Sequence, residues 1–253
     1  MRIALTLTAA SLALAACTTS GGSDASYEEY TGAGTTTEAI AAAVANPARP
    51  DADRERDVLR KPAQIVEFAG VEPGMTIAEI APGGGYYTRI LAQSVGLGGK
   101  VYALMPAFFA NRPGGLDGIN ALAAEYGNVE VVVVDGYDTL TLPMPVDLVW
   151  TTENYHDLAN GDVAAVNDWA FRATKPGGIY FVEDHSAPGT GLTATSTLHR
   201  IDPAAVTEQV IRAGFALEAN SDLLANPADP HNVSPREVEP TSDKFALRFR
   251  KPL

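Results

Sequence analysis

Histidine and carboxylate residues stand together at two places in the second half of the chain. His156 and Asp157 follow one apolar run, and Asp184 and His185 follow another. A histidine can take up or release a proton near neutral pH, and an adjacent carboxylate can assist it. Each pair is therefore a candidate general base for a hydroxyl or amine nucleophile. The structural alternative for any single pair is that its side chains cap a helix or bind loop backbone groups.

The same region offers donors for a metal ion. Imidazole and carboxylate groups are ligands that zinc and related ions accept. Five residues supply them: His156, Asp157, Asp184, His185 and His199. The pair of histidines at helical spacing that marks many zinc sites does not occur in this set. Proton transfer is the leading interpretation, and a metal-assisted hydrolase is an alternative.

A glycine-rich stretch in the first half indicates a second kind of site. Thr76–Ile80 is an apolar run that contains Glu79, and residues 83–85 after it are all glycine. Open α/β sheets hold nucleotide-like ligands at the end of a buried strand, where a carboxylate and a loop without side chains can contact them. The stretch predicts a site for a nucleoside cofactor, although glycines also serve purely structural turns.

These residues need a sheet to position them, and strand-like and helix-like segments alternate along the chain. Strands are expected near residues 76–80, 101–104, 129–134, 146–151, 179–183, 215–224 and 245–250. Helices are expected near residues 35–45, 62–69, 87–95, 119–126, 163–173 and 203–213. The unbroken apolar run 129–134 is typical of strands covered on both faces, and two final strands without a helix between them pair antiparallel. The sequence predicts a doubly wound α/β domain with a mostly parallel seven-stranded sheet that ends in an antiparallel hairpin.

This topology brings the histidine and carboxylate pairs together. The strands expected at 146–151 and 179–183 are neighbours, about 4.8 Å apart. The segments that follow them, 154–157 and 184–185, should therefore converge at one edge of the sheet. We expect them to face the pocket that residues 83–85 line.

The beginning of the chain has the features of an export signal. Met1 and Arg2 precede an uncharged, mostly apolar stretch over residues 3–16, and residues 14–17 resemble a bacterial lipobox that ends in Cys17. We expect a signal peptide over 1–16, a lipidated Cys17 with a flexible tether to residue 50, and a domain over 51–253. Thr18 is not the aspartate that retains lipoproteins in the inner membrane, which points to the periplasmic side of the outer membrane. An ordinary exported protein, cleaved nearby, is the alternative.

Charge and cysteine content exclude several kinds of function. The net charge of −13 repels nucleic acid and anionic lipid, so the expected membrane attachment is the lipid on Cys17 alone. A single cysteine allows no disulfide and no thiolate metal site. Arg49, Arg56 and Arg200 are candidates for holding an anionic group of a small-molecule substrate, although arginines at such positions are usually solvated.

Several motifs together resemble the class I S-adenosylmethionine-dependent methyltransferases, over about residues 51–253. Residues 73–88 resemble motif I of that superfamily, 98–102 its second-strand lead-in, and 175–178 the turn before its fifth strand. More narrowly, four short segments resemble a bacterial group of exported "predicted methyltransferases". These segments are residues 154–157, 183–187, 197–200 and 249–252.

The resemblance implies a cofactor, a reaction and a set of binding residues. The cofactor would be S-adenosylmethionine, and the reaction methyl transfer to an unidentified small molecule. Glu79 would orient the cofactor's amino group through water, and Asp135 would lie against the adenine unless it only forms a turn with Gly136. The positions that correspond to the family's cofactor site are Glu79, Ala81, Gly83, Gly84, Gly85, Asp135 and Asn154.

Two positions depart from the family's pattern. Ala81 replaces the first glycine of motif I, which narrows the loop. Met105 ends the second expected strand, where the family usually has an acidic residue that binds both ribose hydroxyls. Loss of that charge-assisted contact costs roughly 1.5–3 kcal/mol of affinity. Met105 and the exported address favour a further alternative, a catalytically inactive binding lipoprotein of the envelope with the same fold.

Overall fold

The computed structural model describes residues 35–253. The predicted signal peptide, Cys17 and the first part of the predicted tether lie outside these described residues. Within residues 35–253, no helix combines the length and the apolar character needed to cross a bilayer.

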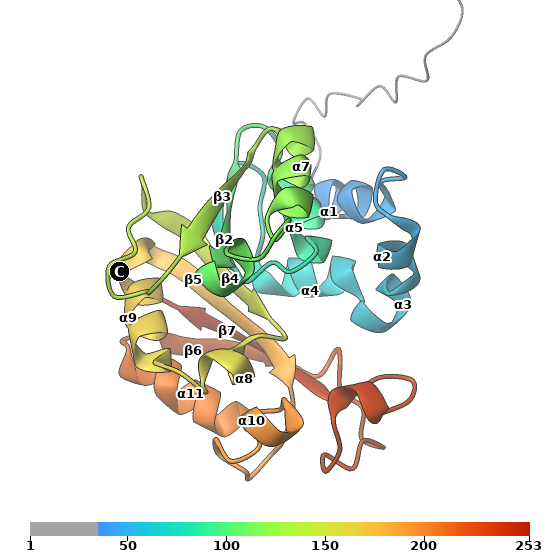
Figure 1. Cartoon of the computed structure of the whole chain (residues 1–253), viewed down its shortest axis with the longest axis vertical. Helices are drawn as coiled ribbons and strands as arrows, with labels where there is room; N and C mark the ends of the chain where they lie inside the picture. Colours follow the sequence, from blue (N-terminus) through green and yellow to red (C-terminus); the bar gives the residue numbers. More distant parts are fainter. Residues whose placement is uncertain (1–34) are drawn as a thin grey trace, which may run out of the picture. The chain divides into compact units, whose positions relative to one another are not determined.

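A seven-stranded sheet forms the centre of the described region (Figure 1). Its strands are β1 Thr76–Ile80, β2 Lys100–Pro106, β3 Val129–Val134, β4 Val146–Thr152, β5 Thr174–His185, β6 Ala216–Ser221 and β7 Lys244–Arg250. They lie in the order β3-β2-β1-β4-β5-β7-β6, and β7 runs in the direction opposite to that of the other six. The predicted α/β class, the seven strands and the antiparallel C-terminal hairpin are confirmed.

Helices cover both faces of the sheet (Figure 1). One face carries α1 Thr36–Ala45, α4 Pro62–Ala69, α5 Tyr86–Val95 and α7 Asp117–Tyr126. The other carries α8 Tyr155–Leu158, α9 Val163–Ala173 and α11 Pro203–Arg212. Short helical turns complete the fold, namely α2 Asp51–Glu55, α3 Asp57–Arg60, α6 Ala107–Ala110, α10 Thr195–Leu198 and η1 Pro235–Glu237. Each face of the sheet therefore packs against its own apolar layer.

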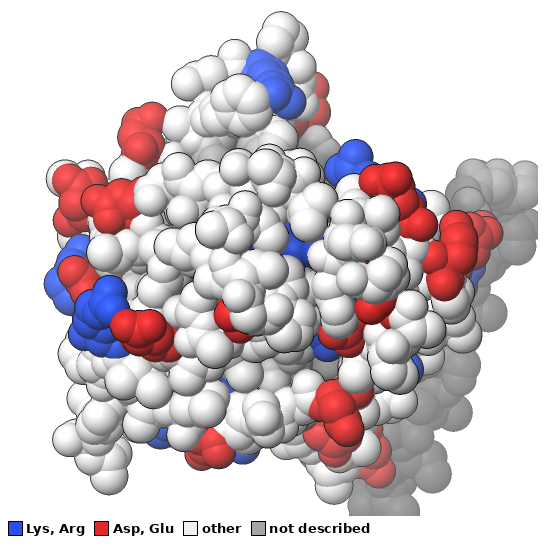
Figure 2. Space-filling view, turned by 90° about the horizontal axis from the view of Figure 1, so that it is seen from below, with Lys and Arg blue, Asp and Glu red and all other residues white. Residues whose placement is uncertain are grey.

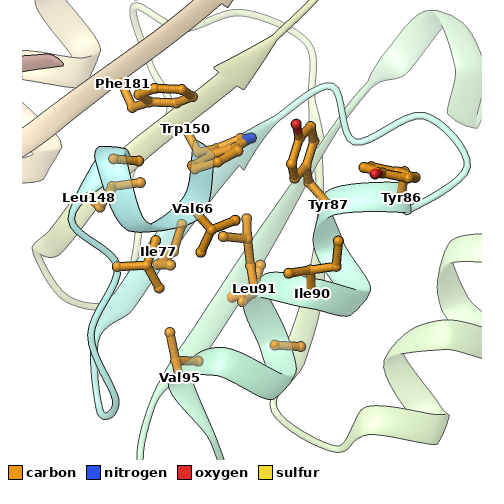
Figure 3. Packing of buried hydrophobic residues seen from close by; sticks show 14 of the residues in the cluster. Val66, Ile77, Tyr86, Tyr87, Ile90, Leu91, Val95, Leu148, Trp150 and Phe181 are labelled. Atoms are coloured by element: carbon orange, nitrogen blue, oxygen red, sulfur yellow. The ribbon is translucent and has the colours of Figure 1, made fainter. Parts of the chain in front are cut away.

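Aromatic residues link α5 to the centre of the sheet (Figure 3). The ring of Trp150 on β4 lies 4.4 Å from that of Phe181 on β5 and 4.9 Å from that of Tyr87 on α5. Such tilted ring pairs add to the stabilisation gained by burying their area. They fix the start of α5, which directly follows the glycine loop, against the strands that carry the histidine and aspartate pairs.

The strand predicted to be covered on both faces lies at one edge of the sheet, where residues 129 and 131 pack in one apolar layer and residues 132 and 134 in the other. Among the described strands β3 pairs with β2 alone, and its Val133 is 45% exposed. The predicted cover on both faces is therefore confirmed for most of the run and fails at Val133. The middle strand of the seven is β4, and β1 beside it is buried along its whole length.

The segment before residue 62 takes part in the fold. Ile40 and Ala43 of α1 are buried in the core, so the structured region begins before residue 51. Arg49 is only 1% exposed, and its guanidinium donates to both oxygens of Asp57 at 2.7 Å. Tyr86 at the start of α5 donates to the same carboxylate. The alternative that Arg49 is simply a solvated arginine is therefore wrong.

Candidate functional site

The carboxyl group of Glu79 lies inside the protein near the end of β1. Its side chain belongs to a residue that is 2% exposed, and it accepts a hydrogen bond from the Thr88 hydroxyl of α5 at 2.6 Å. Burial raises the pKa of Glu79 to about 7, although the bond from Thr88 and the charge of Arg89 oppose the shift. This carboxyl group can therefore gain or lose a proton near neutral pH.

The loop after β1 combines left-handed backbone with open space. Ala81, Gly83 and Gly85 all have positive φ, at 51°, 58° and 82°. A Cβ atom at Gly83 or Gly84 would meet no atom within 4 Å, whereas one at Gly85 would lie 2.5 Å from Cδ1 of Leu122. Gly85 is thus favoured by its left-handed backbone, and a Cβ there would also displace Leu122 of α7, while Gly83 and Gly84 border space that a ligand could fill.

Asn154 holds the glycine loop in place. Its side-chain amide donates to the carbonyl oxygens of Thr152 at 2.6 Å and of Ala81 at 3.2 Å. These bonds tie the loop to the end of β4, and the assignment of Asn154 to the cofactor by the resemblance stays a prediction. Asn154 is a positioning residue.

The second and third strands present different groups at their ends. Met105 lies inside β2, pairs with Val133 and is buried in the apolar layer that includes α5 and α7. No carboxylate stands at that point. Asp135 after β3 is exposed and lines a cavity of about 540 Å³. Residues 136–138 and several residues of the segment 157–166 form the rest of its wall.

His156 and Asp184 form a buried pair, as the convergence of β4 and β5 predicted. The imidazole Nδ1 lies 2.7 Å from one carboxylate oxygen of Asp184, and the backbone N–H of His156 donates to the other oxygen at 2.7 Å. Burial alone would lower the pKa of His156, but the contact with Asp184 outweighs it and raises that pKa above its ordinary value. Since a carboxylate only accepts, Nδ1 is the donor and the lone pair of the neutral ring lies on Nε2.

Asp157 and His199 complete this side of the cluster. Nε2 of His156 and Nδ1 of His199 each lie 3.5 Å from Oδ1 of Asp157. The side chains of Asp157 and His199 are more than half exposed, in contrast to the buried His156. The fourth predicted residue, His185, has its ring centroid 6.0 Å from that of His156.

His185 differs from His156 in its ionisation. Its Nδ1 lies 2.8 Å from the Ser242 hydroxyl, and burial lowers its pKa to about 4, although Glu153 and Asp184 oppose the shift. The ring is therefore uncharged at neutral pH. Of the two predicted bases, His156 is the one suited to proton transfer there.

A group of four ionisable side chains beside the histidines was not predicted, and two of them, Glu183 and Lys244, are buried. Arg60 of α3 and Lys244 of β7 both pair with Glu153, and Lys244 also lies 3.6 Å from Glu183. Burial opposes the charge of Glu153, but the two cations outweigh it and hold its pKa well below the usual range. Burial raises the pKa of Glu183 instead. Glu153 also has positive φ, at 54°, a conformation that side chains other than glycine seldom adopt.

Arg60, Glu153 and Lys244 line a cavity of about 720 Å³, whereas Glu183 lies behind its wall. Its walls come from Arg56 and α3, from α8, from the ends of β4 and β5, from the start of β7, and from the loop at residues 234–242, shown in red in Figure 1. His156, Asp157, His185 and His199 all lie on it. Residues 83–85 line neither this cavity nor the smaller one, so the expectation that the cluster and the glycines face one pocket is not met.

The three candidate arginines have different environments. Arg49 forms an ion pair with Asp57. Arg200 is fully buried, and its guanidinium lies 2.9 Å from the carboxylate of Asp229. Arg56 alone of the three lies on the wall of the larger cavity. The face shown in Figure 2 carries acidic and basic residues dispersed among uncharged ones, without a continuous basic patch.

The fold and this site invite comparison with known proteins. No protein-family model and no curated protein sequence matches the chain. Among solved structures, an S-adenosylmethionine-dependent methyltransferase from Aquifex aeolicus is 19% identical, with a TM-score of 0.57 over 78% of this chain and 92% of that chain. The glycopeptide N-methyltransferase MtfA, in complex with S-adenosylmethionine, is 16% identical, with a TM-score of 0.53 over 76% and 87%.

A third structure of this fold carries a different activity in its name. The cyclase SpnF is 17% identical, with a TM-score of 0.57 over 83% of this chain and 86% of that chain. Likeness at such low identity establishes the fold alone, because one fold hosts many activities. The chain has the class I methyltransferase fold.

Proposed function

We propose that this protein transfers the methyl group of S-adenosylmethionine to a small-molecule acceptor. The observation that carries the proposal is the end of β1, where the buried Glu79 precedes a loop with open space over Gly83 and Gly84. In open α/β sheets, ligands bind at the carboxyl ends of the strands, at the point where the strand order reverses. Here that point lies between β1 and β4. The likeness to solved methyltransferases supports the same choice.

The loop residues fit such a cofactor. Glu79 would orient the cofactor's amino group, and the backbone at Gly83 and Gly84 would approach its methionine and ribose portions. Asp135, on the wall of the smaller cavity, would lie against the adenine. The bound cofactor would supply an electrophilic methyl group.

The larger cavity is the proposed acceptor site. His156 lies on its wall, oriented by Asp184 so that Nε2 is the free ring nitrogen. That nitrogen can act on an acceptor hydroxyl or amine, either by taking its proton or by holding an ion that polarises it. Arg56, on the same wall, would attract an anionic acceptor.

Met105 favours a second function. Without an acidic residue at the end of β2, the ribose hydroxyls lose a usual partner, and the protein would then bind an envelope ligand without methyl transfer. The two functions differ in what occupies the glycine loop. Mass spectrometry of material that co-purifies with the protein separates them, since adenosylhomocysteine would contradict the binding function.

The test of the proposal is calorimetric titration of the purified protein with S-adenosylmethionine and adenosylhomocysteine. We expect one site, weakened at least about tenfold by Glu79→Ala and by Gly84→Ala. Gly84→Ala places its methyl group in open space, so its unfolding should match the wild type. Gly98→Ala is the matched control, because its Cβ also meets no atom within 4 Å. Gly98 precedes the start of β2, at the end of the strands opposite to the glycine loop. Absence of binding by the wild type would end the proposal.

A further inference from the structure

Three side chains on the wall of the larger cavity have the geometry of metal ligands. Nε2 of His156 and Nδ1 of His199 each lie 3.5 Å from Oδ1 of Asp157, and the three donor atoms lie within 4.8 Å of one another. Two ligand atoms bound to one zinc ion at 2.0–2.2 Å are separated by about 3.0 to 3.5 Å. We infer that His156, Asp157 and His199 bind a divalent transition-metal ion, with zinc as the representative.

Asp184 supports this assignment from behind the ligand. Histidines that bind metals almost always donate their other ring N–H to a carboxylate or carbonyl, which orients the ring. The 2.7 Å contact between Nδ1 of His156 and the fully buried Asp184 has this form. It leaves Nε2, on the side of Asp157, as the nitrogen that coordinates.

His199 is held in position by the residue that follows it. Arg200 is fully buried and donates to the carbonyl oxygens of Ser186 and Val233 and to Asp229. His199 itself has positive φ, at 53°, after the last turn of α10. The backbone therefore fixes the position of the Cβ atom of His199. Its exposed imidazole can still rotate and so shorten the distance between its donor nitrogen and that of His156.

The charges and the cavity agree with an ion at this point. In the part of the chain that the structure describes, the ion pairs of Asp157 are with the two imidazoles and with no lysine or arginine. Two nitrogens and one carboxylate suit zinc-like ions, whereas magnesium and calcium prefer oxygen ligands alone. The cavity leaves the remaining coordination positions open to water or to a substrate oxygen.

The ion site stands whether or not the proposed function is correct. In an enzyme that methylates a hydroxyl group, the ion would bind the acceptor oxygen and lower the pKa of the hydroxyl. The oxygen would then lose its proton more easily and could accept the methyl group. His156 would then act as a ligand rather than as the base itself. The test below contains no methyl donor, so its failure and the failure of the cofactor titration are separate results.

The experiment is a zinc titration of the chelator-treated full chain, followed by calorimetry and elemental analysis. We expect one zinc per chain. His199→Ala, at an exposed position that leaves the core untouched, should abolish most of this affinity, and Asp184→Asn should weaken it about 10–100-fold through the orientation of His156. Circular dichroism confirms that each variant is folded.

The matched control is His231→Ala. His231 also pairs with an aspartate, Asp243 at 2.8 Å, but it lies outside the cluster. Its replacement should leave zinc binding unchanged. The inference is overturned if the wild type takes up no zinc, or if His199→Ala binds zinc as tightly as His231→Ala does. A cobalt-loaded sample adds an optical readout, since its visible absorption should disappear in His199→Ala.

Discussion

The carboxyl group of Glu79 shows how the fold sets the chemistry of one residue. It lies in the core between β1 and α5, and its hydrogen-bond partner is the hydroxyl of Thr88. Desolvation of a carboxylate costs more than this single bond returns, so the pKa of Glu79 rises to about 7. Near neutral pH Glu79 is therefore about half ionised, and a positively charged ligand group beside it would favour the ionised form.

Glu79→Gln should change how stability depends on pH. The raised pKa means that the folded state holds the proton more tightly than the unfolded state, so the free energy of unfolding falls as pH rises from about 4.5 to about 7. Between pH 5 and pH 8 this loss amounts to about 2 to 3 kcal/mol in the wild type and is missing from the variant. Urea unfolding at the two pH values measures it. Equal pH dependence in both proteins would show that Glu79 ionises normally.

The pairing of His156 with Asp184 could be predicted because the two residues follow neighbouring parallel strands. Glu153 and Lys244 could not be joined in the same way. Lys244 opens β7, and its position beside His185 depends on the antiparallel register between β5 and β7. The turn signals before β7 do not fix that register, so the buried charges at this edge become visible only in the structure.

At the scale of elements, the segment of α2 and α3 depends on one buried ion pair. Arg49 and Asp57 bind in a bidentate manner, and Tyr86 ties the pair to α5. Burial opposes the charge of Asp57, but the hydrogen bonds from Arg49 and Tyr86 outweigh it and hold its pKa below the ordinary value. This network is why a segment that is mostly charged packs on the domain instead of extending into solvent.

Asp57→Asn should detach this segment. It leaves the guanidinium of Arg49 buried without its counter-charge, which costs roughly 3 kcal/mol of stability. Thermal unfolding and proteolysis between residues 46 and 61 measure the effect. Asp51→Asn is the control, because Asp51 forms an exposed pair with Arg54 that should contribute less than about 1 kcal/mol. Equal losses in the two variants would contradict the role of the buried pair.

The loop at residues 222–243, which forms one wall of the larger cavity, depends on Arg200. This arginine follows His199 and donates to Asp229 and to the carbonyl of Val233 within the loop. The ion pair therefore connects the loop to the end of α10. Its side chains are both fully buried, so neither can exchange its partner for water.

Arg200→Met should release that loop. The change leaves Asp229 buried without a cation, and we expect a loss of about 3 to 5 kcal/mol together with faster amide hydrogen exchange over residues 222–243. Arg212→Met is the control, since its exposed pair with Glu208 should contribute less than about 0.5 kcal/mol. Unchanged exchange in Arg200→Met would mean that the loop is held by other contacts.

For the whole molecule, the sequence predicts the architecture better than the position of each strand within it. The alternation of strands and helices is enough for the doubly wound sheet, and Pro62 and Gly70 mark the two ends of α4. The apolar run of β3 indicates that both layers cover the strand, but not that it lies at the edge, because an edge strand can be as apolar as an inner one. α2 and α3 were missed because their stability comes from contacts with α5 rather than from their own helical pattern.

The place of β7 in the sheet also determines the order in which the sheet can be completed. β7 follows β6 in the chain but lies between β5 and β6. While a nascent chain still lacks residues 244–250, β6 has no neighbour and the edge of β5 stays open. Unpaired strand edges are templates for association between chains, and long-range pairings form late. Closure of the sheet therefore comes after synthesis of β7, and shorter nascent chains would require protection until then.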